Sequence, residues 1–578
     1  MKSQFRSLPS MNDARNRHDK TAHVIDHNDL SPELKAFASN KKFFIRTFGC
    51  QANIRDEEIM AGYLTNAGFT RTLTPSEADL AIINTCAVRE NAEDKVYGEI
   101  GSFKANHLKN PSFILCVCGC MMQEEKVAEY LAKTYPYVSL VFGTHNISRL
   151  PSLLTDVIKK KERLIDVEST PGAVVEGLPS VRLNDYEAYV NISYGCDKFC
   201  TYCIVPYTRG KERSRRQSDI VKECKLLVEE GYKQITLLGQ NVNSYGLDLE
   251  DGTTFAGLLE EVAKLGVPRL RFITSYPSQF DEATMDTMAK YPNIMKWLHF
   301  PVQSGSSSCL KRMGRRYNRE QYLDLVKKIR EKMPSIALTT DIIVGFPNET
   351  DEEFADTISL CKEVGYSSAF TFIFSPRKGT PAARIVDLVS GETKHKRFDE
   401  LKKVIEESTA KASEEMVGKT YKILVSGPSK RDPNVLSGYA ENGKLVNFVG
   451  PSYLAGAIVD VLIEESHVYS LKGKLVGDPL ILKAKDVAYT VSCDPLMKEF
   501  LRLSKEASGE SYRALADDFV NKKKALALSI GDATKHEQAK KDYEEALMRF
   551  KNDPVLNNLE TLKPLVEEAL LKIQGMLQ

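Results

Sequence analysis

The chain has 578 residues, of which 42% are hydrophobic and 27% charged, and its formal net charge is +1. This composition is typical of a globular protein, and the length predicts about three to five domains. No apolar run reaches the roughly 18 residues that a membrane span needs. A net charge of +1 by itself says nothing about binding to nucleic acid, and any basic surface must be local.

Residues 1–40 contain scattered charges and no apolar core of a secretory signal, so we expect a disordered leader on a cytoplasmic protein. The chain has twelve cysteines. Without an export signal, metal ligation explains them better than disulfides do.

Residues 41–155 alternate short apolar runs with helical patterns, which predicts βα units and an open parallel sheet. Cys50, Cys86 and Cys120 each follow a predicted strand. The carboxyl ends of parallel strands meet at one crevice and neighbouring strands lie about 4.8 Å apart, so three thiols can converge there. Cys118 is the alternative to Cys120, although we expect it within a strand, and Cys116 reads as a core residue.

Three further cysteines, Cys196, Cys200 and Cys203, form a C-x₃-C-x₂-C run within one loop. Three thiolates can hold three irons of a [4Fe–4S] cluster and leave the fourth open to a substrate. Zinc fits less well, because it usually takes four protein ligands and no His lies in this loop. The alternative is three buried cysteines that bind no metal.

The run resembles the signature of radical SAM enzymes, whose open iron binds S-adenosylmethionine (SAM). Residues 182–412 contain six strand-like runs separated by amphipathic helices, which favours a partial (βα)₆ barrel, the fold of that family. The loops at the carboxyl ends of barrel strands carry chemistry. The six runs are Ala188–Ser193, Gln234–Gly239, Leu270–Thr274, Trp297–Val302, Ala337–Val344 and Ala369–Phe374.

The loops after these strands extend the resemblance. Gln240-Asn241-Val242-Asn243 and the segments 204–215, 299–306, 340–347 and 375–382 are similar to those of MiaB-type tRNA methylthiotransferases. The resemblance spans residues 41–485 and implies an α/β enzyme. It implies a radical SAM cluster on Cys196, Cys200 and Cys203, and a second [4Fe–4S] cluster on Cys50, Cys86 and Cys120.

The implied reaction adds a methylthio group to C2 of N6-dimethylallyladenosine at position 37 of tRNA, with electrons from an external donor. In this family SAM is cleaved to a radical that abstracts the C2 hydrogen, and a second SAM supplies the methyl group. Two alternatives stay open. The first is the same chemistry on threonylcarbamoyladenosine-37 tRNA or on a ribosomal-protein aspartate. The Gln-Asn-Val-Asn sequence at 240–243 argues against both of these substrates, because the enzymes that use them usually lack it. The second alternative is a cluster-bearing RNA-binding scaffold.

Contacts to SAM are less explicit in the sequence. Gln303, Asp341 and Gly345 lie at predicted strand ends that face the expected pocket, so we predict that they contact the ribose, adenine or methionine groups. The alternative is that they are turn and packing residues.

Two basic clusters lie beside loops of the expected active site. Lys and Arg supply most of the sequence-independent affinity for RNA by neutralising phosphates, so we predict RNA contacts there; the alternative is a solvated charged face. The residues are Arg209, Lys211, Arg213, Arg215 and Arg216 in the first cluster, and Lys311, Arg312, Arg315 and Arg316 in the second.

Two C-terminal segments complete the chain. Residues 414–484 have short β-type runs with Gly-rich turns and resemble the TRAM domain, a small RNA-binding β-barrel. Tyr439 lies where the TRAM family commonly has a basic residue. A phosphate contact is therefore either missing at this position or replaced by stacking on the tyrosine ring. Residues 487–578 read as all helical and resemble, more loosely, the YlbF/YmcA family. They predict a protein partner or self-association, the alternative being a generic helical oligomerisation module.

Overall fold

The computed structural model describes residues 3–5, 21–87, 91–168 and 173–577. The chain divides into two compact units. One comprises Met1–Leu226 and Tyr232–Pro479, and the other comprises Leu227–Gly231 and Leu480–Gln578. Within the described ranges, every helix is too short or too polar to cross a membrane.

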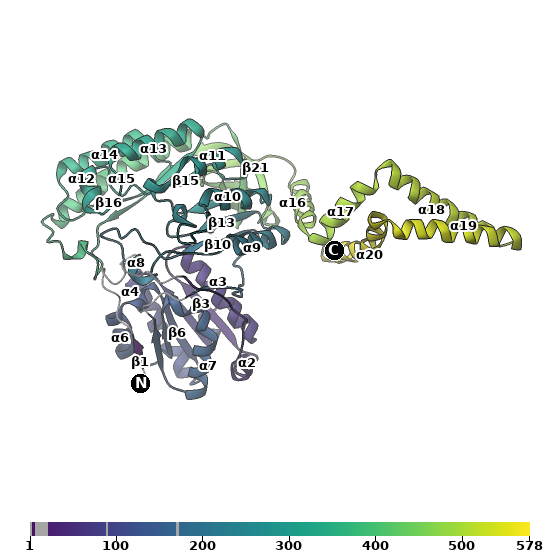
Figure 1. Ribbon diagram of the computed structural model, residues 1–578. Coiled ribbons are helices and arrows are strands. Elements are labelled where there is room, and N and C mark those ends of the chain that lie inside the picture. The colour runs from purple at the N-terminus through teal and green to yellow at the C-terminus, as the bar shows by residue number, and fades with distance from the viewer. Residues whose placement is uncertain (1–2, 6–20, 88–90, 169–172, 578) are drawn as a thin grey trace. The chain divides into compact units, whose positions relative to one another are not determined.

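The N-terminal domain is an open sheet of seven parallel strands in the order β1-β8-β7-β6-β5-β3-β4 (Figure 1). The strands are β1 (Ser3–Phe5), β3 (Lys42–Thr47), β4 (Thr70–Arg71), β5 (Leu80–Thr85), β6 (Ile114–Gly119), β7 (Leu140–Phe142) and β8 (Leu164–Val167). The helices are α2 (Pro32–Ala38), α3 (Gln51–Ala67), α4 (Asn91–Ser102), α5 (Lys104–Lys109), α6 (Glu125–Thr134) and α7 (Leu150–Lys160).

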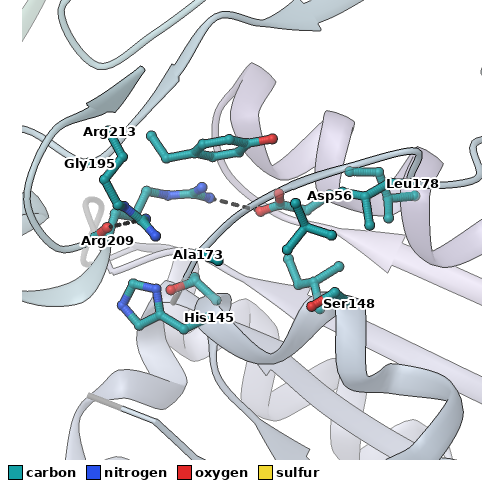
Figure 2. Close-up of a pocket in the computed structure, with 13 residues that line it drawn as sticks. Asp56, His145, Ser148, Ala173, Leu178, Gly195, Arg209 and Arg213 are labelled. Atoms are coloured by element: carbon teal, nitrogen blue, oxygen red, sulfur yellow. Dashed lines mark hydrogen bonds and ion pairs between the residues drawn. The ribbon is translucent and has the colours of Figure 1, made fainter. Parts of the chain in front are cut away.

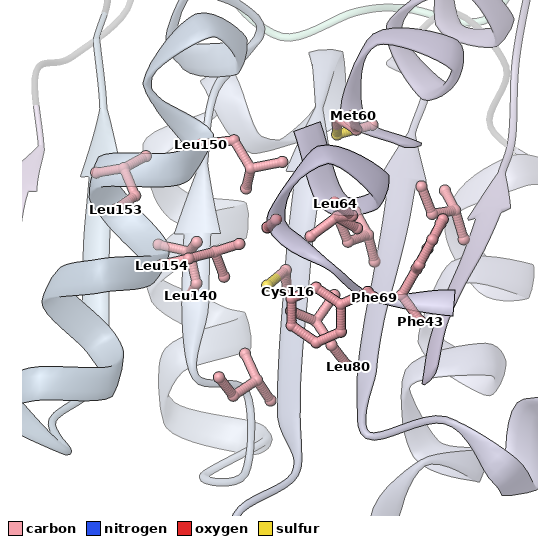
Figure 3. Close-up of a cluster of buried hydrophobic side chains, with 14 of the residues drawn as sticks. Phe43, Met60, Leu64, Phe69, Leu80, Cys116, Leu140, Leu150, Leu153 and Leu154 are labelled. Carbon is pink, nitrogen blue, oxygen red and sulfur yellow. The ribbon is translucent and has the colours of Figure 1, made fainter. Parts of the chain in front are cut away.

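Both faces of this sheet are buried, as a parallel sheet requires. Phe43 packs with Met60 and Leu64 of α3 in the cluster of Figure 3. The next residue of β3, Phe44, points to the opposite face and packs in a separate cluster with Phe103. The predicted open parallel sheet is confirmed.

The predicted disordered leader is wrong for residues 21–40. A strand β2 (His23–Ile25) pairs with β9 (Val174–Glu176), and α2 buries Leu34 and Ala38 in the core. The Ser31 hydroxyl caps α2 by accepting from the Leu34 N–H at 3.1 Å. Strand β1 pairs with β8, while residues 1–2 and 6–20 lie outside the described residues.

The central domain has six parallel βα strands in two groups, β10-β13-β14 and β15-β16-β17. A parallel bridge between Leu270 and Ile294 connects β14 to the segment before β15, so the partial barrel is confirmed. Its strands are β10 (Glu187–Asn191), β13 (Gln234–Leu238), β14 (Arg269–Ile273), β15 (Trp297–His299), β16 (Ala337–Val344) and β17 (Ser368–Ile373), with a small ribbon of β11 (Ser193–Tyr194) and β12 (Arg213–Ser214). Its helices are α8 (Val205–Thr208), α9 (Gln217–Glu229), α10 (Phe255–Lys264), α11 (Glu282–Lys290), α12 (Ser307–Arg312), α13 (Arg319–Lys332), α14 (Asp351–Val364) and α15 (Gly391–Glu414).

A closed five-stranded barrel follows, in the order β18-β19-β20-β22-β21. Arg269 of β14 fastens it to the central domain by donating to the backbone oxygens of Tyr439 at 2.8 Å and Lys422 at 2.6 Å. Four of these strands overlap the β-type runs expected from the sequence, at 420–425, 436–440, 445–449 and 457–463, whereas the fifth, β22, was missed. The strands are β18 (Thr420–Pro428), β19 (Val435–Ala440), β20 (Leu445–Val449), β21 (Ile458–Ser466) and β22 (Leu471–Leu475).

The second unit is helical, as predicted. Its first helix begins at Pro479 and continues to Cys493, so the predicted boundary at 484–487 falls inside a helix and is wrong by about two turns. In its last helix Leu556 and Val566 are buried, whereas Leu570 is 45% exposed. The helices are α16 (Pro479–Cys493), α17 (Pro495–Ala507), α18 (Glu510–Leu528), α19 (Ala533–Asn552) and α20 (Pro554–Leu577).

Candidate active site

Cys50, Cys86 and Cys120 follow three adjacent strands, β3, β5 and β6. Cys50 is the N-cap residue of α3. Gly49 has φ +123°, and a Cβ there would lie 3.2 Å from Cys86 Sγ, so glycine lets the two segments approach. Burial raises the pKa of the Cys120 thiol to about 12; Arg209 opposes this rise, and the neighbouring Cys86 and Cys50 add to it. The three thiols therefore occupy one neighbourhood.

The competing cysteines of this domain lie in the core. Cys116, which Figure 3 labels, and Cys118 are both buried in the same hydrophobic cluster. The Cys118 thiol contacts Met60 Sδ at 3.7 Å. These contacts favour Cys120 over Cys118 as the third member of the triad.

Cys196, Cys200 and Cys203 lie in a tight loop directly after β11. The Cys203 N–H donates to the Cys200 oxygen at 3.0 Å. Gly195 has φ +74°, and a Cβ there would lie 2.0 Å from the Lys211 oxygen, so the turn requires glycine. Arg315 Nη1 lies 3.5 Å from Cys200 Sγ.

Three thiols at each site are donors of the kind that iron–sulfur clusters use. All twelve cysteines are free thiols. In the part of the chain that the structure describes, no three His, Cys, Asp or Glu side chains close around one metal ion. A cubane cluster does not require such an approach, since each cysteine binds a different iron.

One pocket joins the N-terminal domain to the mouth of the barrel. Cys50 lines it together with Tyr194 and Gly195 of the cysteine loop. Gln240 and Thr274, which follow β13 and β14, line the other side. A cysteine of the first triad thus faces the strand ends at which this kind of barrel carries chemistry.

Arg209 reaches from the central domain to the first cysteine triad. It follows α8 in the central domain, yet its Nε donates to Cys120 Sγ at 3.2 Å. Its Nη2 donates to Asp56 Oδ2 and to Asn53 Oδ1, both at 3.0 Å. Figure 2 shows Arg209 directed toward Asp56 beside a second pocket, which His145 and Arg213 also line.

A network of three arginines and three glutamates joins α3 to the central domain. Arg215 Nη2 lies 2.6 Å from Glu176 Oε2, and its Nη1 lies 2.7 Å from Glu223 Oε2. Arg182 bridges Glu58 and Glu223, in each case at 2.8 Å. The members are Arg55, Glu58, Glu176, Arg182, Arg215 and Glu223.

Two of the predicted SAM contacts lie side by side. The Gln303 N–H donates to the Asp341 oxygen at 2.9 Å, and Gln303 has φ +71°. The Asp341 carboxylate lies 3.3 Å from His299 Nε2, a neighbour that the sequence did not single out. Gln303 and Asp341 therefore share one end of the barrel.

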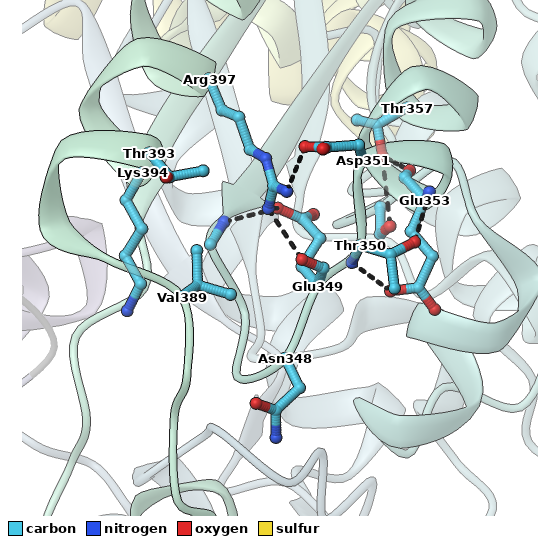
Figure 4. A network of polar contacts seen from close by, with 12 residues as sticks. Asn348, Glu349, Thr350, Asp351, Glu353, Thr357, Val389, Thr393, Lys394 and Arg397 are labelled. Carbon is cyan, nitrogen blue, oxygen red and sulfur yellow. Dashed lines mark hydrogen bonds and ion pairs between the residues drawn. The ribbon is translucent and has the colours of Figure 1, made fainter.

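Gly345 follows β16 and is held by protein groups. Its N–H donates to Glu349 Oε2 at 2.8 Å, and Arg397 Nη1 binds the same oxygen at 3.1 Å, in the network of Figure 4. A Cβ on Gly345 would lie 2.5 Å from Lys394 Cγ. Its φ of +66° and the close Lys394 side chain favour glycine at this position, and the predicted contact with SAM stays a prediction.

The basic residues that were predicted to contact RNA separate into two groups. Arg209, Arg213 and Arg215 are buried, and ion pairs with Asp56, Glu176 and Glu223 occupy Arg209 and Arg215. The prediction that these three bind phosphate is wrong for the folded chain, because a run of charges does not reveal burial.

In the second basic cluster, Arg312 pairs with Glu353 at 2.6 Å and Arg315 contacts Cys200. The guanidinium groups of both residues therefore already contact protein side chains. Arg216, Lys311 and Arg316 are exposed, and Lys211 is half-buried. For the three exposed residues, the predicted contact with RNA stays a prediction.

The chain matches three family descriptions, each at a position that agrees with the fold. Residues 42–143 match "Uncharacterized protein family UPF0004", residues 190–361 match "Radical SAM superfamily", and residues 414–476 match "TRAM domain". The solved radical SAM methyltransferase TsrM from Kitasatospora setae covers 60% of this chain and 75% of its own, at 15% identity and a TM-score of 0.45.

The chain also has relatives that share about half of its residues over most of its length. The tRNA-2-methylthio-N(6)-dimethylallyladenosine synthase of Bacillus subtilis (strain 168) is 51% identical over 478 residues, which is 82% of this chain and 94% of the relative. The protein of the same name from Anoxybacillus flavithermus is 50% identical over 82% of this chain and 90% of its own. The chain belongs to the family of tRNA-2-methylthio-N(6)-dimethylallyladenosine synthases, radical SAM enzymes whose chemistry uses SAM and a [4Fe–4S] cluster.

Proposed function

We propose that this chain adds a methylthio group to C2 of N6-dimethylallyladenosine at position 37 of tRNA. The pocket that joins Cys50 to the strand ends of the barrel carries the proposal, because it lets a sulfur-bearing centre and a radical centre act on one base. The names of the relatives supply the substrate. An aromatic C–H has no proton that a general base can remove, so a radical route is needed.

We assign the six cysteines to two clusters. Cys196, Cys200 and Cys203 would hold the radical SAM cluster, and Cys50, Cys86 and Cys120 would hold a second one. When bound, the two groups supply the electron that cleaves SAM and the sulfur that is transferred. The role of the chain is to orient them, to keep water out of the pocket and to hold SAM beside Gln303, Asp341 and Gly345.

Exposed cations and the small barrel form the proposed tRNA surface. Arg216, Lys311 and Arg316 would neutralise phosphates. Tyr439 is 50% exposed on β19 and offers a face on which a base can stack. An external electron donor and a cytoplasmic location belong to the same proposal.

The helical unit follows the last of the three matched family segments, which ends at residue 476. We propose that it binds a protein partner or a second copy, as its likeness to the YlbF/YmcA family implies. Leu565 and Leu571 of α20 are 49% and 66% exposed, which supports such contacts.

The direct test uses the reconstituted protein with SAM, dithionite and tRNA that carries N6-dimethylallyladenosine. Mass spectrometry of the digested nucleosides should show the methylthio derivative together with 5′-deoxyadenosine. Conversion of threonylcarbamoyladenosine instead would show that the substrate is threonylcarbamoyladenosine-37 tRNA. Formation of neither product would favour the scaffold alternative.

A further inference from the structure

Each cysteine triad has one arginine that donates to one of its sulfurs. Arg315 Nη1 lies 3.5 Å from Cys200 Sγ within the central domain. Arg209 Nε lies 3.2 Å from Cys120 Sγ, although the two residues are 89 positions apart. Arg209 belongs to the loop that continues from Cys196–Cys203, so the segment around one triad supplies the cation of the other.

The surroundings of Arg209 fix its guanidinium in this position. Asn53 and Asp56, which accept from Nη2 at 3.0 Å, both lie on α3. Cys50 is the N-cap of the same helix. One planar group therefore connects the Cys50 helix to the Cys120 sulfur, and a fork of this kind suits arginine better than lysine.

Domain fastening alone does not explain the contact with sulfur. The six-member network through Arg215 and Glu223 already joins α3 to the central domain. Arg209 adds to this junction an N–H aimed at a thiol. Hydrogen bonds to ligand sulfurs and nearby net charge are levers that set the reduction potential of iron–sulfur clusters.

We propose that Arg209 is a positioning residue of the N-terminal cysteine site, which orients Cys120 and sets the reduction potential of the cluster bound there. The proposal depends on the proposed second cluster. A cation beside a ligand sulfur stabilises the reduced cluster, because reduction adds negative charge. Loss of the cation therefore shifts the midpoint potential to more negative values.

The test uses the full chain with Cys196, Cys200 and Cys203 changed to Ala, so that iron occupies only the N-terminal triad. Midpoint potentials come from redox titration followed by electron paramagnetic resonance, with iron content measured alongside. The variants are Arg209→Gln and Arg209→Lys. The controls are Arg216→Gln, an exposed residue of the same run, and Arg315→Gln, at the other triad.

We expect Arg209→Gln to shift the midpoint to more negative values and Arg209→Lys to shift it less, while both controls match the parent. Loss of iron in Arg209→Gln, with retention and a shift in Arg209→Lys, would also support the proposal. Glu223→Gln weakens the ion-pair network between the domains but changes no contact with the triad sulfurs. The midpoint potential of the cluster in this variant should therefore equal that of the parent.

Equal midpoints in the parent and both Arg209 variants would overturn the proposal and leave the second cluster standing. A shift in Glu223→Gln as large as that in Arg209→Gln would also overturn it, because the effect would then be general loosening. A parent chain that binds no iron would overturn the second cluster and this proposal together.

Discussion

Arg215 Nη1 lies 2.7 Å from the Glu223 carboxylate, and this contact joins the residue after β12 to α9. Burial opposes the ionisation of Glu223, but Arg215, Arg55 and Arg182 outweigh it and lower the pKa of this carboxyl to about 2. Arg55 and Arg182 each also form an ion pair with Glu58 of α3. Glu223 is thus the centre of the ion-pair network that joins the N-terminal domain to the central domain.

We expect Glu223→Gln to lower the free energy of unfolding by about 3 kcal/mol at neutral pH, because it leaves buried guanidiniums without a counter-charge. A carboxyl with a depressed folded pKa stabilises the fold above its ordinary value of 4.5 and loses that effect as pH falls toward 2. Urea unfolding of the iron-free chain should therefore show a difference that shrinks below pH 4.5. Glu352→Gln, at an exposed position, is the control; a difference that persists unchanged at acid pH would contradict the account.

Replacement of Cys200 by Ala should remove about half of the iron and all SAM cleavage, because two cysteines do not keep a site-differentiated cubane. Cys86→Ala should remove the other half and spare the cleavage of SAM in the absence of tRNA. Cys118→Ala is the matched control and should keep all the iron, since Cys118 packs against Met60. Iron analysis and 5′-deoxyadenosine measurement check this. One substitution that empties both sites would refute two separate triads.

The convergence of Cys50, Cys86 and Cys120 could be predicted from the sequence, because each lies just past a strand and parallel topology gathers strand ends. The other triad was predicted from its C-x₃-C-x₂-C spacing. The roles of Arg209 and Arg215 could not, since their partners lie far away in the chain: Cys120 is 89 residues from Arg209, and Glu176 is 39 residues from Arg215. Charge in a sequence does not show whether a side chain is buried.

Two elements were missed for local reasons. Strand β22 alternates buried Leu471 and Gly473 with two lysines, a pattern with little β-propensity of its own that pairing with β20 and β21 overrides. Helix α2 did carry a readable signal, because Ser31 followed by Pro32 is typical of a helix start.

The exposed basic residues should govern the salt dependence of tRNA binding. We expect the triple change of Arg216, Lys311 and Arg316 to Ala to weaken binding and to reduce the log–log salt slope by up to about two units, from roughly 0.7–0.9 per phosphate contact. Fluorescence anisotropy across a salt series measures both quantities. Lys524→Ala, an exposed change on α18, is the control. An unchanged slope would mean that these residues form a solvated charged face and do not contact phosphates.

The helical unit should be dispensable for the chemistry. Every proposed cluster ligand precedes residue 204, and the five-stranded barrel is complete at Leu475. A chain that ends at Pro479 should therefore bind iron at both triads and modify tRNA, while its association with itself or a partner changes. Iron analysis and light scattering test this. Loss of both clusters on truncation would make the helices an integral part of the enzyme.

The nucleoside profile of tRNA from a strain that lacks its own methylthiotransferase, complemented with this chain, tests the central claim most directly. The account predicts that N6-dimethylallyladenosine is converted to its 2-methylthio derivative, and that the same chain with Cys200→Ala leaves it unconverted. An unconverted dimethylallyladenosine pool in the presence of the intact, iron-loaded chain would contradict the account.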